Sequence, residues 1–380
     1  MNKIVPLRII EIKAIAFDED SERSSLGVFL NNEKLKKISV FTGSSMKNNK
    51  SIIEKLTALW ALNESGLGGF LHVFNSPFTG LIVGGVSILL ISLIAYYAKN
   101  KWQAILKALV IVLIIKMAVS PYSPFGAYVA VSFQAVLGAI LFSNFSWKGA
   151  TIMVLGMVTF LESALQKLLI LTIVYGTNLW EAIDIYGAWV QKKLDFVSET
   201  STTSVLVTTY LLVYGICGIL AGIFIKNTIK IISNKKETDF YLHLETDKLD
   251  KKTKKVAFKT KVIWVWLGTV AVMVLAFSIF GGPLLGWQKA IYIVLRSFLI
   301  LMLWYLVIGP FLLKVVQKYL RKKESKYQED IANAMDLFPY FRQIIAFTWK
   351  DTKHLKGYTR FQYFMANSIS NCIHFKVPSE

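Results

Sequence analysis

The sequence predicts an all-α membrane protein, a polytopic bundle of about six to eight transmembrane helices. Hydrophobic residues make up 54% of the 380 residues, and they are gathered in blocks separated by polar stretches. A helix needs about 20 apolar residues to cross a hydrocarbon core of about 30 Å, and several of the blocks have this length. Because backbone polar groups must be paired within lipid, we expect each block to be helical. A small polar N-terminal cap and amphipathic C-terminal helices complete the predicted fold.

The charge of the chain supports a membrane location. The formal net charge is +19, and the basic residues lie mostly in loops and in the C-terminal tail. Lysine and arginine close to membrane spans mark the cytoplasmic side and attract anionic lipid headgroups. We therefore expect a multi-pass protein of the cell membrane, or of the inner membrane in a host that has two. Its expected partner is a bilayer with anionic headgroups, and nucleic acid is not expected.

Residues 1–76 form the predicted polar cap. Short runs with β-like composition are separated by acidic and Asn/Gly turns, and a helix is predicted to start at Ser51, so the cap could be a small α+β domain. A partly ordered tail is the alternative.

Residues 77–226 form the predicted core bundle. Its expected spans are Thr79 to Tyr97, Trp102 to Ala118, a helix within Ser120 to Phe142, Gly149 to Tyr175 and Val205 to Ile225. Residues 179–194 combine an apolar face with acidic and basic residues and two tryptophans, which is typical of a helix lying at the membrane interface. The segment from Gly149 to Tyr175 is too long for a straight perpendicular span, so we expect it to be tilted or broken near Glu162.

The C-terminal half adds further helices. Residues 227–261 are a basic loop, predicted to be cytoplasmic, residues 262–313 contain two further spans, and residues 314–380 form a basic amphipathic helical tail. The tail could lie on the membrane, dock a soluble partner or pack within the protein. An even number of spans would place the cap and the tail together in the cytoplasm.

Small residues predict where helices pack closely. Gly126, Ala130, Gln134 and Gly138 recur at every fourth position and share one helical face. Glycine and alanine allow helix backbones to approach closely in lipid. The full set of predicted packing residues is Gly80, Gly84, Gly126, Ala130, Gly138, Gly218 and Gly222.

Polar side chains within the apolar blocks are the candidate functional site: Glu162, Gln134, Gln166 and Lys167. A carboxylate inside a membrane is costly and usually faces a partner, a cavity or a permeation path, which makes Glu162 the strongest candidate. It could accept hydrogen bonds from Gln134 or pair with Lys167 or Lys116. The alternative roles are a structural ion pair of Glu162 with Lys167, and an interhelical hydrogen bond from Gln134.

No enzyme is predicted. The four histidines, His72, His243, His354 and His374, lie in separate regions without metal-binding spacing, and Cys217 and Cys372 are not expected to pair. The sequence has no Gly-rich loop ending in Gly-Lys-Ser/Thr, which binds nucleotide phosphates. We therefore expect no catalytic residue, metal or cofactor, and any energy for transport would come from a separate protein.

One stretch resembles a known family. Pro124-Phe125-Gly126-Ala127-Tyr128-Val129-Ala130, followed by Gln134 and by Leu137-Gly138-Ala139-Ile140-Leu141-Phe142, resembles the substrate-capture subunits, or S components, of energy-coupling-factor importers. The likeness covers roughly Thr79 to Lys226. It implies a helical bundle that takes up a vitamin or a metal together with a transmembrane subunit and cytosolic ATPases. The family's small packing residues match Gly80, Gly84 and Gly85, but no ligand-binding residue can be carried over. The polar cap, the two further spans and the long tail depart from the family.

Two functions remain open from the sequence. The first is a transport component that captures or moves a small solute and is energised by a cytosolic ATPase or another membrane subunit. The second is a membrane scaffold or regulatory anchor, in which the helices only hold the cap, the loop and the tail. The small-residue faces and Glu162 favour transport.

Overall fold

The computed structural model describes residues 49–67, 79–120, 123–145, 148–194, 200–235 and 287–376. The chain divides into two compact units, Met1–Ser51 and Ile52–Glu380, and nearly all described residues belong to the second. The predicted β-like runs of the cap, most of the basic loop and the predicted span from Val262 to Phe280 lie outside the described residues. The second unit is described below by itself.

The predicted all-α membrane fold is confirmed, since the described elements are helices and six of them are long and apolar enough to cross a membrane. The first described elements are a helix over residues 49–62 and the π-helix η1 Asn63–Leu67. The next elements are α4 Thr79–Tyr97, α5 Lys101–Val119, α6 Phe125–Asn144, α7 Lys148–Tyr175, α8 Asn178–Lys193 and α9 Thr202–Asn234. The C-terminal elements are α11 Trp287–Leu303, η3 Trp304–Ile308, α12 Gly309–Glu324, η4 Ser325–Tyr327, α13 Gln328–Asp336, α14 Phe338–Asp351, η5 Thr352–His354 and α15 Gly357–His374.

Local sequence explains where several helices begin. The side chain of Asn100 caps α5 by accepting a hydrogen bond from the backbone N–H of Gln103 at 3.2 Å. The Ser201 hydroxyl caps α9 in the same way, accepting from the N–H of Ser204 at 3.1 Å. Such side-chain caps satisfy backbone donors that have no partner within the helix. Pro124 precedes α6 in an extended conformation, because its ring fixes the backbone there.

The helix from residue 52 onward and η1 belong to the same compact unit as the bundle, although the sequence assigned residues 1–76 to the cap. The reason is an apolar run that buries Leu56 and Trp60 completely. This run is too short to be recognised as a span, but its side chains belong to the same hydrophobic core as those of α4 and α5. The following π-helix η1 contacts both α4 and α5.

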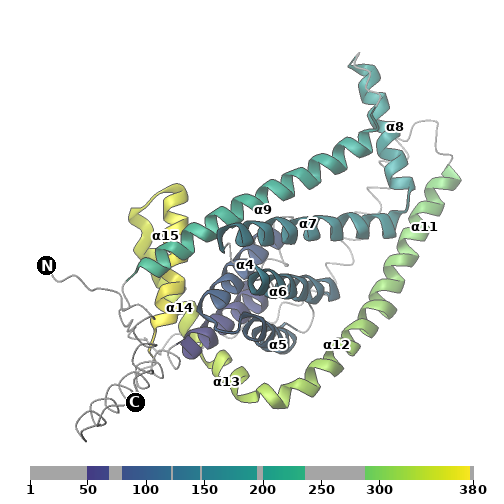
Figure 1. Cartoon of the computed structure of the whole chain (residues 1–380). Coiled ribbons are helices and arrows are strands. Elements are labelled where there is room, and N and C mark those ends of the chain that lie inside the picture. Colours follow the sequence, from purple (N-terminus) through teal and green to yellow (C-terminus); the bar gives the residue numbers. More distant parts are fainter. Residues whose placement is uncertain are drawn as a thin grey trace, which may run out of the picture. The chain divides into compact units, whose positions relative to one another are not determined.

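The alternative that the fourth segment breaks near Glu162 is wrong, because α7 is one continuous helix of 28 residues. It lies beside α9, which has 33 residues, and the two helices run next to each other in Figure 1. Both are longer than a perpendicular span needs, so the other expected outcome, a tilted helix, fits their length.

The contact between α7 and α9 is a backbone contact at glycines. A Cβ atom on Gly218 would lie 2.6 Å from the carbonyl oxygen of Gly156, and one on Gly222 would lie 2.6 Å from the Cα of Met153. No side chain fits into these gaps, so glycine is required for the helices to approach this closely.

The C-terminal part of the chain continues from α11 through the π-helix η3 into α12, as the curved green ribbon in Figure 1 shows. Pro310 stands in the first turn of α12, where its missing N–H disrupts few helical hydrogen bonds. The predicted tail therefore starts inside α12. Pro339 likewise stands in the first turn of α14, directly after α13 ends.

Candidate functional site

A buried ion pair joins η1 to α5. The Nζ atom of Lys116 in α5 donates to the Oε2 atom of Glu64 in η1 at 2.7 Å. The Lys116 and Glu64 side chains are only 4% and 3% exposed, respectively. Removing either partner would leave an uncompensated buried charge, which is strongly destabilising. The pair therefore ties η1 to α5.

Two more side chains form hydrogen bonds around this pair. The Ser87 hydroxyl in α4 donates to Glu64 Oε1 at 2.6 Å, so both carboxylate oxygens accept a hydrogen bond. The Asn63 amide donates to the Ser87 oxygen at 2.9 Å and to the carbonyl oxygen of Val83 at 3.0 Å. We call Asn63, Glu64, Ser87 and Lys116 the ion-pair network. It connects three elements, η1, α4 and α5.

The local conformation of η1 lets its neighbouring residues Asn63 and Glu64 contact α4 and α5 at the same time. η1 is a π-helix, a form that is rare and often found at functional positions. Its wider turn lets Asn63 reach α4 while Glu64 reaches both α4 and α5. The Tyr128 ring of α6 covers the pair from another side, with its centroid 6.0 Å from Lys116 Nζ.

A second set of polar side chains comes from α6 and α7. Gln134 is 4% exposed, Thr159 is 0% exposed, and Glu162 is half-buried. One oxygen of each side chain, Gln134 Oε1, Thr159 Oγ1 and Glu162 Oε2, is buried without a hydrogen-bond partner within the part of the chain that the structure describes. A buried polar atom without a partner costs about 1–3 kcal/mol, so such atoms are rare and need an explanation. We call these three residues the acceptor cluster.

Contacts with α4 place the two groups close together in the bundle. A Cβ atom on Gly84 would lie 3.3 Å from Gln134 Nε2 and 3.9 Å from the ring of Phe160, the residue that follows Thr159. Gln134 and Thr159 therefore lie at about the same level. Ser87 of the ion-pair network lies three residues after Gly84 on the same face of α4. The two polar groups thus meet at one helix.

The predicted site residues are only partly brought together. Gln166 Nε2 donates to the carbonyl oxygen of Gly126 at 3.4 Å and joins α7 to α6. Lys167 Nζ donates to the Tyr214 hydroxyl at 3.0 Å, which directs this side chain to α9. Neither predicted pairing of Glu162 is found among the described residues, because Lys167 makes no ion pair with it and Lys116 pairs with Glu64.

The predicted small-residue contacts can be compared with the structure one by one. A Cβ on Gly126 would lie 2.8 Å from Gln166 Nε2, and one on Gly138 would lie 2.8 Å from Ile91 Cγ2. Gly84, Gly218 and Gly222 also lie at helix contacts, as described above, and Ala130 is half-buried. Gly80 differs, since a Cβ there would meet nothing within 4 Å among the described residues. Gly80 is exposed near the start of α4, and the packing predicted there stays a prediction, because the described residues offer it no contact.

Sequence reasoning missed the ion-pair network. Asn63, Glu64 and Ser87 were not candidates, because the first two lie in a polar stretch assigned to the cap. Lys116 was a signal for such a pair, since a lysine inside a mainly apolar span needs a buried partner or a path to water. Its partner is 52 residues away in the sequence, and no local pattern connects the two.

No group of three or more His, Cys, Asp or Glu side chains in the described ranges could hold a metal ion. The three oxygens of the acceptor cluster are of the types that accept hydrogen bonds. Searches of protein-family models, of curated proteins and of solved structures found no match to this chain.

Proposed function

We propose that this chain is a membrane transport component that binds a small polar solute between α4, α6 and α7. The observation that supports the proposal best is the acceptor cluster, in which three oxygens are buried without a partner among the described residues. A solute that donates hydrogen bonds would satisfy these oxygens and offset the cost of burying them. Polar and ionisable residues inside membrane bundles commonly mark substrate or ion pathways.

The chemistry of the cluster favours a donor-rich solute. An amide oxygen and a carboxylate oxygen accept hydrogen bonds, while a hydroxyl both accepts and donates. A small molecule with amino, hydroxyl or amide groups would suit Gln134, Thr159 and Glu162 together. The neighbouring ion-pair network supports the same site, because its hydrogen bonds hold α4 firmly against η1 and α5.

An energising partner is part of the proposal. The sequence has no loop for binding nucleotide phosphates, so a cytosolic ATPase or another membrane subunit would supply the energy. The outer face of α9 could contact such a subunit or lipid, since Leu212 and Leu220 are 60% and 58% exposed.

The test compares small molecules that copurify with the protein. The full chain is purified in mild detergent and denatured, and the released molecules are identified by mass spectrometry. Variants Gln134→Leu and Glu162→Gln should release at least about tenfold less of one polar compound. Gln134→Leu removes the amide acceptor, and Glu162→Gln removes the negative charge and replaces one carboxylate acceptor with an NH2 donor, each a loss of about 1.5 kcal/mol or more. Glu181→Gln, at an exposed carboxylate of α8, is the matched control and should release as much as the wild type.

Stability measurements separate a binding role from a structural one. If Glu162 serves binding, Glu162→Gln should keep its yield and melting temperature while it loses the compound. A fall in yield and melting temperature with unchanged release would assign Glu162 to structure. Identical release from the wild type and both cluster variants would refute the transport proposal.

The second candidate, a membrane scaffold, is supported by exposed aromatic residues on the C-terminal helices. Trp349 of α14 and Tyr358, Phe361 and Tyr363 of α15 are 41% to 60% exposed. Exposed aromatic groups are common at protein interfaces. A scaffold would copurify with partner proteins but release no solute, so the same purification distinguishes the two functions.

A further inference from the structure

The helix α12 has three distinct faces. Leu320 is 1% exposed, and Leu313 and Val316 pack with it against the core of the bundle, where α12 contacts α5. This first face fixes the rotation of the helix, so the side chains on the other faces must point outward.

The second face of α12 is an exposed apolar stripe. Phe311, Val315 and Tyr319 recur at every fourth residue and are 64%, 53% and 57% exposed. Their spacing places them in one row along the helix. A row of large, exposed apolar side chains is typical of a surface that contacts lipid or another protein.

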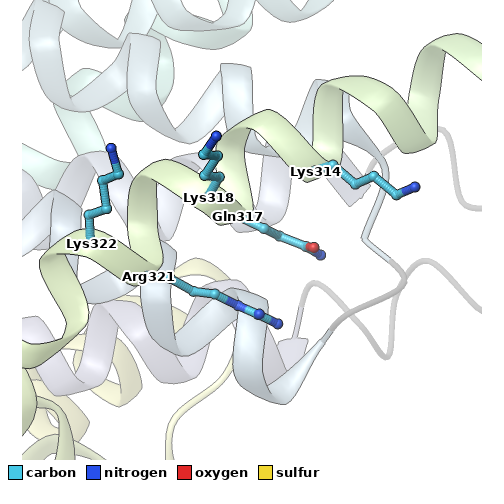
Figure 2. Close-up of a pocket in the computed structure, with 5 residues that line it drawn as sticks. All are labelled: Lys314, Gln317, Lys318, Arg321 and Lys322. Carbon is cyan, nitrogen blue, oxygen red and sulfur yellow. The ribbon is translucent and has the colours of Figure 1, made fainter.

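The third face of α12 is a basic stripe. Lys314, Lys318, Arg321 and Lys322 are all exposed, and with Gln317 they line a shallow hollow of about 490 Å³. Figure 2 shows Lys318 and Lys322 extending side by side from the helix, while Arg321 and Gln317 extend in another direction. None of the four cations forms an ion pair with an acidic side chain in the described ranges.

We infer that α12 is a docking helix for anionic phospholipids of the cytoplasmic leaflet. Its apolar stripe enters the boundary of the acyl chains, and its basic stripe binds the phosphate-bearing headgroups. Three observations lead to this assignment: the apolar and basic stripes are adjacent, both are exposed, and α12 directly continues the apolar helix α11 through η3. A basic amphipathic helix next to a membrane span is the arrangement that recognises anionic lipid. This inference does not depend on the proposed transport function.

The binding test uses the full chain in mild detergent with short-chain lipids as probes. Microscale thermophoresis would compare dioctanoyl phosphatidylglycerol, which is anionic, with dioctanoyl phosphatidylcholine, which has no net charge. We expect the wild type to bind the anionic lipid at least about tenfold more tightly, since each nearby cation adds to the attraction. Raising the salt concentration should reduce this preference, because exposed charges are screened.

Two variants separate the basic stripe from the apolar stripe. The triple variant Lys314→Gln, Lys318→Gln, Lys322→Gln should lose the preference for the anionic lipid. The variant Val315→Ser, Tyr319→Ser should bind both lipids more weakly and keep the preference. The matched control is Lys350→Gln, Lys353→Gln, Lys356→Gln, which removes the same charge from exposed positions elsewhere in the tail and should behave as the wild type.

Several results would overturn the inference. Equal affinity of the wild type for both lipids would do so, as would an unchanged preference in the α12 triple variant or an equal loss in the control. Displacement of the lipid by glycerol phosphate at the same concentration would indicate a site for a free phosphate compound. Binding of an acidic peptide without any lipid preference would assign α12 to a protein partner. A salt-independent preference in the wild type would exclude the basic stripe without any variant.

Discussion

Two regions of the bundle are held together in different ways. Around α4 and α5, buried polar side chains connect the helices through the ion-pair network. Between α7 and α9, the backbones touch at Gly156, Gly218 and Gly222. The most apolar stretch of α4 is 61% buried, whereas that of α9 is only 22% buried. We call the part around α4 and α5 the inner region and the contact of α7 with α9 the outer region. The stability of the inner region depends on keeping charges paired, and that of the outer region depends on keeping side chains small.

The largest effect is expected from breaking the inner ion pair. Lys116→Met leaves the carboxylate of Glu64 buried without its cation and should destabilise the protein by about 3–5 kcal/mol. The double variant Glu64→Gln, Lys116→Met removes both charges and should recover part of this loss. Thermal melting in detergent measures both. If Lys116→Met alone melts like the wild type, the inner region does not depend on this pair.

The next largest effect is expected at the glycine contact of the outer region. A Cβ on Gly218 would lie 2.6 Å from backbone atoms of α7, so Gly218→Ala must push the helices apart, at a cost of about 1–3 kcal/mol. Gly215→Ala is the matched control on the same helix, because the nearest atom to its Cβ, Leu161 Cδ2, is 3.7 Å away. Melting temperatures should fall for the first variant only. Equal melting of the two variants would contradict a backbone contact.

A smaller effect is expected at the second lysine of α5. Lys107 pairs with Asp330 of α13 at 2.9 Å, but its side chain is 42% exposed. Exposed ion pairs contribute about 0.2–1 kcal/mol and are weakened by salt. Lys107→Gln should therefore lower the melting temperature far less than Lys116→Met, and only at low salt. A loss as large as that of Lys116→Met would show that burial does not explain the difference between the two lysines.

The smallest effect concerns reactivity and not stability. Cys372 of α15 is fully buried, and burial raises the pKa of its thiol well above the usual range. The thiol stays protonated near neutral pH and should react slowly with a maleimide. A cysteine introduced at the exposed Ser325 is the control and should react at once. Rapid labelling of Cys372 in the native protein would show that the tail is packed more loosely than the inner region.

Much of the fold could be predicted from apolar blocks alone. The ranges of α4, α5 and α7 agree closely with the predicted spans, because a membrane requires long uninterrupted apolar helices. The helix over residues 49–62 was assigned to the cap, since its charged residues hide the short apolar run that packs into the bundle. Hydropathy detects contact with lipid, and this helix is buried by protein.

The candidate site could be predicted only in part. Gln134 and Glu162 were identified because polar residues stand out within apolar blocks, and both have buried oxygens without a partner among the described residues. Thr159 was missed, since threonine is common in membrane helices and its burial depends on α4 and α6. The ion pair of Glu64 with Lys116 could not be predicted, because it depends on how η1 packs against α5, and the sequence pattern does not show this tertiary contact.

The order of the two partners in the sequence bears on how Lys116 finds its carboxylate. A lone lysine within a span costs about 2.5–3.5 kcal/mol on insertion scales, and Lys116 is almost completely buried. Glu64 precedes Lys116 by 52 residues, so the ribosome has already delivered the carboxylate when α5 reaches the insertion machinery. The carboxylate that neutralises Lys116 in the folded bundle is therefore made before the lysine itself, so the pair can form as soon as α5 packs against η1.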